Sequence, residues 1–179
     1  MTDGKVIVDN ERMTRMLARL AHEIIEQNPE EETVYLIGIK RRGVPIAARL
    51  KENIERFSGI KGELGELDIT LYRDDLTERF PEPKVESTVI PFDVAGKRII
   101  LVDDVLFTGR TTRAAMDAVI RLGRPKKIEL CVLVDRGHRE LPISANYVGK
   151  NIPTSRKEFV SVRVTEFDGK DEIALFSRD

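Results

Sequence analysis

The sequence predicts an α/β fold: a central parallel sheet flanked by helices, with a small substructure appended near the C-terminus. Along most of the chain, short apolar runs rich in β-branched residues alternate with segments whose apolar residues recur at the helical period. Such alternation is typical of parallel sheets covered by helices. Beyond residue 140 only strand-like runs follow, and no shift in composition along the 179 residues marks a second domain.

Each element is predicted from its local pattern. Asp9 or Asn10 can cap the first helix, and Gly123 and Pro125 end the last long one. The first helix is expected to run from Asp9 or Asn10 to about residue 27, followed by a strand at 33–39, a helix at 43–57, a loop with three glycines at 58–66, a strand at 67–72 and a polar loop at 73–85. After these we expect a buried strand at 99–102, a helix to 122, a strand at 128–134, and strands at 147–149, 159–166 and 172–176.

Composition and charge narrow the classes of protein. The chain is 41% hydrophobic and 34% charged, which is typical of globular domains. No apolar run approaches the roughly 20 residues of a membrane helix, and the N-terminus lacks the apolar core of a signal peptide. The single cysteine, Cys131, lies in an apolar run, so we expect a buried free thiol and a cytoplasmic protein. A net charge of −1 means that RNA binding would need a local basic face.

The most informative segment is 98–112, RIILVDDVLFTGRTT. A buried strand ends in two carboxylates, Asp103 and Asp104, at the sheet edge where open α/β folds bind ligands. Threonine hydroxyls and the backbone of Gly109 then precede a helix whose free N–H groups favour an anion. The pattern predicts a binding site for a ribose 5-phosphate. The alternative is a buried strand and a capped turn with solvated acids.

This segment resembles the phosphoribosyl-pyrophosphate (PRPP) signature of type I phosphoribosyltransferases. The resemblance implies one such domain over residues 1–179, with a hood over the base from about 135 to 179 and a flexible loop at about 73–87. Asp103 and Asp104 would hold the ribose hydroxyls. The substrate-binding residues implied are Asp103, Asp104, Val105, Leu106, Phe107, Thr108, Gly109, Arg110 and Thr111, joined by Arg41, Arg42, Arg136 and Val160.

Two further segments can meet the diphosphate. Lys40, Arg41 and Arg42 follow a strand and are bracketed by glycines, a pattern that suits a diphosphate. The resemblance makes this the pyrophosphate loop, where relatives often hold a non-proline cis peptide; a solvated basic turn is the alternative. Arg73 in the flexible loop would reach the leaving diphosphate, unless the loop is only a polar surface loop. No metal-ligand cluster is predicted, and Mg²⁺ would bind mainly through diphosphate and ribose oxygens.

The segments VDRGHRELP (134–142) and VGKNIPTS (148–155) point to one branch of the family. They resemble the bacterial pyrimidine-operon attenuation regulators that are also uracil phosphoribosyltransferases, over residues 10–170. Arg136 would then line the base and diphosphate side, and Val160 would border the base. Phe107 stands where purine-salvage relatives carry an acid, which favours a pyrimidine unless Phe107 is a core residue. Asp104 argues against the dedicated uracil enzymes, which tend to have proline there.

The first helix carries a basic ridge. Arg12, Arg15, Arg19 and His22 recur at steps of three and four, opposite the apolar stripe. An ordinary solvated face is the alternative. The resemblance implies a dimer face that binds an mRNA hairpin, with Arg19, His22, Arg139, Lys150 and Arg156 as candidate contacts.

The resemblance therefore implies two roles. The enzyme would join uracil to PRPP, giving UMP and diphosphate, and UMP or UTP in the same site would favour binding of pyrimidine-operon leader mRNA and transcription attenuation. A homodimer or larger homo-oligomer is expected. Two alternatives stay open: a plain nucleobase-salvage enzyme with no RNA role, and an RNA-binding regulator with an inactive site.

Overall fold

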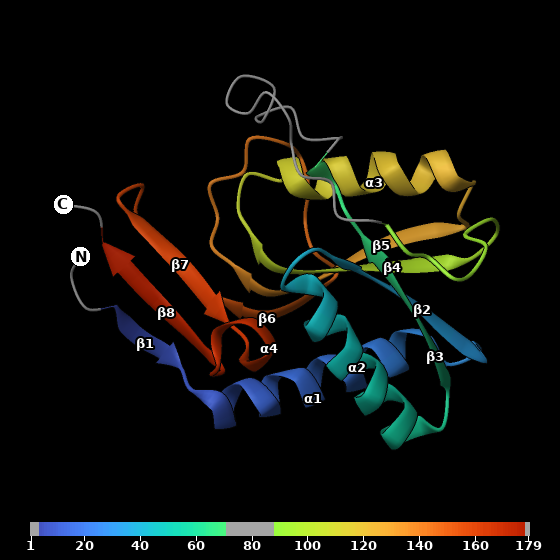
Figure 1. Cartoon of the computed structure of the whole chain (residues 1–179), viewed down its shortest axis with the longest axis horizontal. Helices are drawn as coiled ribbons and strands as arrows, with labels where there is room; N and C mark the ends of the chain where they lie inside the picture. The colour runs from blue at the N-terminus through green and yellow to red at the C-terminus, as the bar shows by residue number, and fades with distance from the viewer. Residues whose placement is uncertain (1–3, 71–87, 178–179) are drawn as a thin grey trace.

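The computed structural model describes residues 4–70 and 88–177 and confirms the predicted α/β class. Five parallel strands form the main sheet in the order β3-β2-β4-β5-β6, and β1, β8 and β7 form a smaller antiparallel sheet at one side (Figure 1). Helices α1 and α2 cover one face of the main sheet and α3 the other (Figure 1). Two apolar cores result, one on each face.

The described residues form the following helices and strands. Their bounds are β1 Lys5–Val8, α1 Asn10–Gln27, β2 Thr33–Ile39, α2 Gly43–Ser58, β3 Lys61–Leu67, β4 Arg98–Leu106, α3 Arg110–Leu122, β5 Lys127–Asp135, β6 Tyr147–Asn151, β7 Glu158–Arg163, α4 Thr165–Asp168 and β8 Glu172–Ser177. The Asp9 carboxylate caps α1 by accepting a hydrogen bond of 2.9 Å from the backbone N–H of Arg12. None of the helices in the described residues is long and apolar enough to cross a membrane.

One predicted loop is a strand. The glycine-rich segment 58–66 was expected to be irregular, yet β3 runs through most of it and pairs in parallel with β2. Gly62 and Gly65 serve packing here: a Cβ at Gly62 would lie 2.5 Å from Lys51 Cγ in α2, and one at Gly65 would lie 3.1 Å from Ile90. The strand predicted at 67–72 was therefore placed too late, because close approach and not a turn requires these glycines.

The strand-like runs near the C-terminus divide between the two sheets. β6 extends the main sheet beside β5, whereas β7 and β8 form the small sheet together with the N-terminal β1. Strand β1 was not predicted, because four residues are too short to show a periodic pattern. In place of the end of the strand expected at 159–166, the chain turns into the short helix α4.

Candidate functional site

The acid pair lies inside a strand that is longer than predicted. β4 continues to Leu106 because its parallel pairing with β5 extends to Leu106 and Asp135. Asp103 is buried, with 8% of its surface exposed, and Asp104 is half-buried. One carboxylate oxygen of Asp103 accepts a hydrogen bond of 2.9 Å from the N–H of Asp104, whose own carboxylate accepts one of 2.8 Å from the N–H of Val105. These bonds fix both carboxylates at the carboxyl edge of the sheet.

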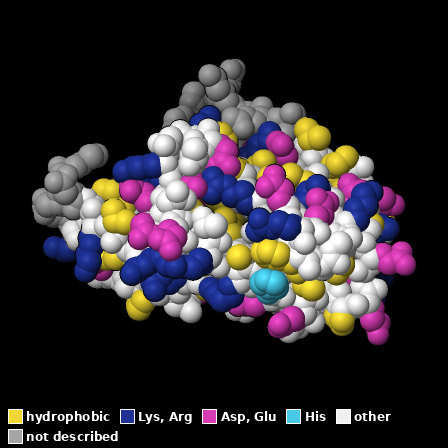
Figure 2. All heavy atoms as spheres, turned by 90° about the horizontal axis from the view of Figure 1, so that it is seen from below, with side chains coloured by type: hydrophobic (Ala, Val, Ile, Leu, Met, Phe, Trp, Pro, Cys, Tyr) yellow, Lys and Arg dark blue, Asp and Glu magenta, His cyan; other side chains and the backbone are white. Residues whose placement is uncertain are grey.

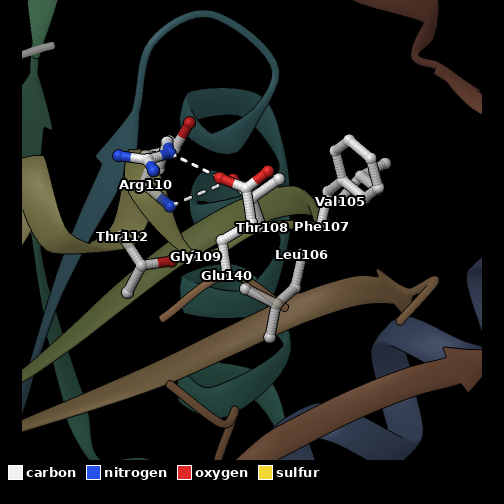
Figure 3. A pocket seen from close by; sticks show the side chains of 9 residues that line it. Val105, Leu106, Phe107, Thr108, Gly109, Arg110, Thr112 and Glu140 are labelled. Atoms are coloured by element: carbon white, nitrogen blue, oxygen red, sulfur yellow. Dashed lines mark hydrogen bonds and ion pairs between the residues drawn. The ribbon is translucent and has the colours of Figure 1, made fainter. Parts of the chain in front are cut away.

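The turn after β4 lines a cavity at the start of α3. Gly109 caps α3 in the left-handed region, with φ 93°, and has no side chain that could cover the first N–H groups of the helix. A cavity of about 300 Å³ is lined by residues 105–112 and by Glu140 (Figure 3). Free N–H groups at a helix start, with threonine hydroxyls beside them, favour a phosphate. The predicted residues Val105, Leu106, Phe107, Thr108, Gly109, Arg110 and Thr111 all line this cavity.

Glu140 was not predicted for this cavity. Its backbone N–H donates to the carbonyl oxygen of Thr108 at 2.9 Å, and its carboxylate accepts a hydrogen bond of 2.7 Å from Arg110 Nε (Figure 3). Glu140 lies on the loop after β5, and nothing in the sequence around it indicates that it will contact the turn between β4 and α3. The carboxylate therefore places negative charge at the wall of a cavity suited to a phosphate.

The basic loop between β2 and α2 has the expected backbone. The peptide bond between Lys40 and Arg41 is cis. The bracketing glycines allow close packing within the protein: a Cβ at Gly38 would lie 2.5 Å from Val44 Cα, and one at Gly43 would overlap the carbonyl oxygen of Val102 in β4. We expected these glycines to admit a ligand. The structure instead shows that Gly38 lets β2 approach the start of α2, and that Gly43 brings the loop against β4, the strand that carries the acid pair.

Arg42 joins this loop to the small sheet. Its Nη2 donates to Asp168 Oδ1 at 2.8 Å and its Nε to Asp168 Oδ2 at 3.1 Å, so α4 is held against the start of α2. The hydrogen bond from Arg42 holds the pKa of the Asp168 carboxyl below its usual range. Arg49 adds a second connection, with 2.6 Å to Glu166 and 2.9 Å to Asp171. Asp168 was not predicted, because it lies 126 residues from its partner.

The end of β5 forms the neighbouring wall. Arg136 is buried, with its guanidinium carbon 4.0 Å from the centre of the Phe107 ring, and it donates to Thr154 Oγ1 at 3.0 Å and to the carbonyl oxygen of Glu158 at 2.7 Å. Phe107 is 41% exposed, so it is not the core residue that we considered as an alternative. Arg136 thus connects the signature turn to β7, the strand that also carries Val160.

A second cavity, of about 400 Å³, lies where β5 and β6 end. Residues 135–139, Asn151, Pro153 and Thr154 line it. His138 makes an edge contact with Phe107, with ring centres 5.9 Å apart, and its Nε2 lies 2.6 Å from the carbonyl oxygen of Thr154. The cavity is therefore next to the Phe107 turn, on the side away from β2.

A basic pocket occupies the opposite flank of β6. A cavity of about 320 Å³ is lined by Ile7, Val8, Arg12, Arg15, Met16, Arg19, Gly149 and Lys150. A Cβ at Gly149 would overlap the side chain of Met16, so glycine there allows β6 to pack closely under α1. Arg19 donates to the carbonyl oxygen of Gly149 and pairs with Glu23. Figure 2, which shows the side of α1 and α2, has many Lys and Arg side chains interspersed with acidic ones.

The five candidate RNA contacts do not all lie together. Arg19 and Lys150 share the basic pocket, and His22 lies one turn further along α1. Arg139 instead pairs with Asp135 and donates to the carbonyl oxygens of Phe107 and Ile143, at 2.7 and 2.8 Å, so its guanidinium braces the loop after β5. Arg156 lies between β6 and β7. Arg73 and the whole of the flexible loop expected at about 73–87 lie outside the described residues.

Comparison with known proteins decides the family. The model of the phosphoribosyl transferase domain matches residues 3–166. The chain belongs to the phosphoribosyltransferase family. The relatives include proteins named bifunctional protein PyrR: that of Clostridium novyi is 58% identical over 97% of both chains, and that of Thermus thermophilus is 59% identical over 93% of this chain and 92% of its own.

Solved phosphoribosyltransferases share the fold. The hypoxanthine-guanine phosphoribosyltransferase of Bacillus anthracis superposes with a TM-score of 0.73 at 22% identity, covering 95% of this chain and 96% of its own. The hypoxanthine phosphoribosyltransferase of Trypanosoma cruzi gives 0.74 at 18% identity, covering 98% and 97%. At these identities the likeness concerns the fold alone, and it agrees with the architecture described above.

Proposed function

We propose that this phosphoribosyltransferase joins uracil to PRPP, giving UMP and diphosphate, and also binds pyrimidine-operon leader mRNA when a uridine nucleotide occupies the same site, causing transcription attenuation. The observation that carries the proposal is near-full-length identity above one half to proteins named bifunctional PyrR, in a chain with both a phosphate cavity beside an acid pair and a separate basic pocket. The name of the relatives supports two activities, and the presence of two separate cavities supports a separate site for each.

In the proposed reaction, the protein contributes mainly by positioning the substrates and by stabilising the charges of the transition state. The 5′-phosphate lies against the start of α3, and Asp103 and Asp104 hold the ribose hydroxyls through carboxylates already oriented by backbone N–H groups. The base approaches from the cavity at the ends of β5 and β6. An oxocarbenium-like transition state needs fixed negative charge near the ribose and fixed positive charge near the leaving diphosphate, and a preorganised site supplies both at little reorganisation cost.

The positive charge comes from the loop between β2 and α2. Lys40 and Arg41 lie on this loop beside β4, and Arg42 is placed by Asp168. We also assign Arg73 to the leaving diphosphate. Mg²⁺ fits the donor set, because two adjacent aspartates offer carboxylate oxygens and the substrate supplies the remaining ligands. When bound, the metal neutralises part of the diphosphate charge.

The regulatory role depends on a connection between the two sites. β6 provides it: Asn151 lines the base-side cavity, and its neighbours Gly149 and Lys150 line the basic pocket. A ligand that fixes the end of β6 therefore also biases the pocket. In the described part of the chain, Arg12 and Lys150 have no ion-pair partner, so both are available for phosphates. Coupling must be reciprocal, so RNA and nucleotide tighten each other's binding by the same factor.

The proposed substrate and RNA partner suggest where the protein acts and how its copies assemble. We propose a homodimer or larger homo-oligomer that acts in the cytoplasm, where PRPP and nascent mRNA are found. Two basic pockets, one from each subunit, would offer a structured RNA more phosphate contacts than one pocket provides.

Two assays test the function. Product formation from PRPP and a panel of bases should give UMP with uracil and little product with purines, and Asp104→Asn should abolish turnover. Gel-shift binding to a pyrimidine-operon leader RNA should tighten when UMP is added. Turnover without RNA binding would leave the plain salvage enzyme, and RNA binding without turnover would leave the regulator with an inactive site.

A further inference from the structure

An exposed aromatic pair lies beside the basic pocket. The rings of His22 in α1 and Phe57 in α2 stack with centres 4.4 Å apart and planes 7° from parallel, and the guanidinium carbon of Arg56 lies 4.8 Å from the centre of the Phe57 ring. All three residues are exposed, Phe57 to 37%. Parallel rings that remain at the surface present flat apolar area to solvent, which is the geometry that binds a further flat ring.

Helix packing does not require this pair. α1 and α2 already meet through a continuous apolar core whose members are fully buried, among them Leu20 and Ile24 of α1 and Leu50 and Ile54 of α2. Phe57 lies in the last turn of α2, beyond that core. Within residues 4–70 and 88–177 neither ring nitrogen of His22 has a hydrogen-bond partner, so the edge of this ring is available to a ligand.

The pair continues the basic surface. His22 follows Arg19 by one helical turn, and Arg19 lines the pocket shared by α1 and β6. Arg56 adds a cation over the Phe57 ring; it donates to Asn53 Oδ1 at 2.8 Å and has no ion-pair partner in the described residues. A strand of RNA leaving the pocket along α1 would therefore meet first a flat ring and then a positive charge.

We propose that His22, Phe57 and Arg56 form a stacking site for one unpaired base of the bound RNA. The base stacks on the His22–Phe57 pair, the imidazole edge hydrogen-bonds to the base or its sugar, and Arg56 neutralises the adjoining phosphate. Structured RNAs are read mainly through unpaired bases that stack on aromatic or guanidinium planes. This proposal rests on the RNA role proposed above and extends its surface from α1 onto α2.

The test compares variants of Phe57 that separate stacking from apolar bulk. Phe57→Leu keeps an apolar side chain without a ring, and Phe57→Tyr keeps the ring. Leader hairpin RNA with 2-aminopurine at successive loop positions is titrated with the full-length protein in the presence of UMP. We expect Phe57→Leu to bind roughly 5- to 30-fold more weakly and Phe57→Tyr to bind about as tightly as the original protein. One loop position should be quenched by the original protein and not by Phe57→Leu.

The outcomes separate this proposal from the RNA role itself. Arg19→Ala serves as the control within the basic pocket. Weaker binding by Arg19→Ala with unchanged binding by Phe57→Leu overturns the stacking site and leaves the RNA role in place. Failure of the original protein to bind RNA overturns both. If Phe57→Leu changes the sedimentation of the protein without changing its RNA affinity, the pair belongs to an interface between copies of the chain, and the proposal is also overturned. Uracil turnover and thermal stability should be the same in all three Phe57 forms.

Discussion

Replacing Asp168 by Asn should weaken the attachment of the small sheet to the loop that we assign to the diphosphate. The carboxylate accepts two hydrogen bonds from Arg42, at 2.8 and 3.1 Å, and one of 2.9 Å from the backbone N–H of Val164. Asparagine has the same size but no charge, and its amide nitrogen cannot accept. The backbone bond can survive, so the measured loss reports mainly the interaction with Arg42.

The expected loss is about 1 kcal/mol in the free energy of unfolding. Hydrogen bonds to charged groups contribute about 1.5–3 kcal/mol when shielded. The side chain of Arg42 is 36% exposed and that of Asp168 is 18% exposed, so solvent screening reduces this value toward that of surface pairs. For a chain of this size, 1 kcal/mol lowers Tm by about 2–4 °C.

The effect should depend on pH in one direction. The hydrogen bond from Arg42 lowers the pKa of Asp168 in the folded protein. A lowered folded pKa gives a stabilisation that is complete above the unfolded value, about 3.9 for aspartate, and is lost as the pH falls through the folded value. The difference between the original protein and Asp168→Asn should thus be full at pH 7 and should shrink below about pH 4.

Urea unfolding followed by circular dichroism from pH 7 to pH 3 measures this difference. Lys170→Gln is the control, because it removes one of the two cations paired with Glu172, a lysine that is 53% exposed, and leaves Arg163 in place, so it should change the unfolding free energy little. Equal stability of Asp168→Asn and the original protein at pH 7 would refute the reasoning. So would a difference that stays undiminished in acid, because an ion pair cannot survive protonation of the carboxylate.

Three further predictions concern other parts of the molecule. The thiol of Cys131, whose pKa burial raises to about 12, should react with a disulfide reagent only on unfolding, and fast labelling of the folded protein would contradict its burial. Gly43→Ala should cost about 2–3 kcal/mol in thermal unfolding, because the Cβ would overlap the carbonyl oxygen of Val102. Gly96→Ala, with open space but a φ of 68°, should cost about 1 kcal/mol, and equal costs would count against the overlap. Glu140→Gln should tighten UMP binding severalfold in calorimetry, and weaker binding would mean that the carboxylate serves to place Arg110.

Much of the proposed phosphate site could be predicted from the sequence because its parts are neighbours in the chain. A buried strand, two aspartates and a glycine turn occupy consecutive positions, and the strand direction alone brings them to one sheet edge. The cis peptide before Arg41 was expected only by resemblance. The positions of Glu140 and Asp168 could not be predicted, since each meets a partner far away in the chain and leaves no periodic pattern.

The glycines also divide into those that the local sequence explains and those that only distant contacts explain. Gly109 has a positive φ at a turn between a strand and a helix, which the local sequence indicates. Gly62 and Gly65 lie in a strand because of what packs against them, and no local signal distinguishes such glycines from those of a loop.

The sequence by itself determined the α/β class, the amphipathic first helix with its basic ridge, the buried thiol and the acid pair before a glycine turn that starts a helix. These features follow from side-chain period, strand burial and backbone freedom, which act over a few residues. Only the tertiary structure decided that Arg42 is held by Asp168, that Arg139 braces its own loop, and that His22 stacks on Phe57. Such contacts form when segments far apart in the chain pack together, and the geometry of that packing is a property of the whole fold.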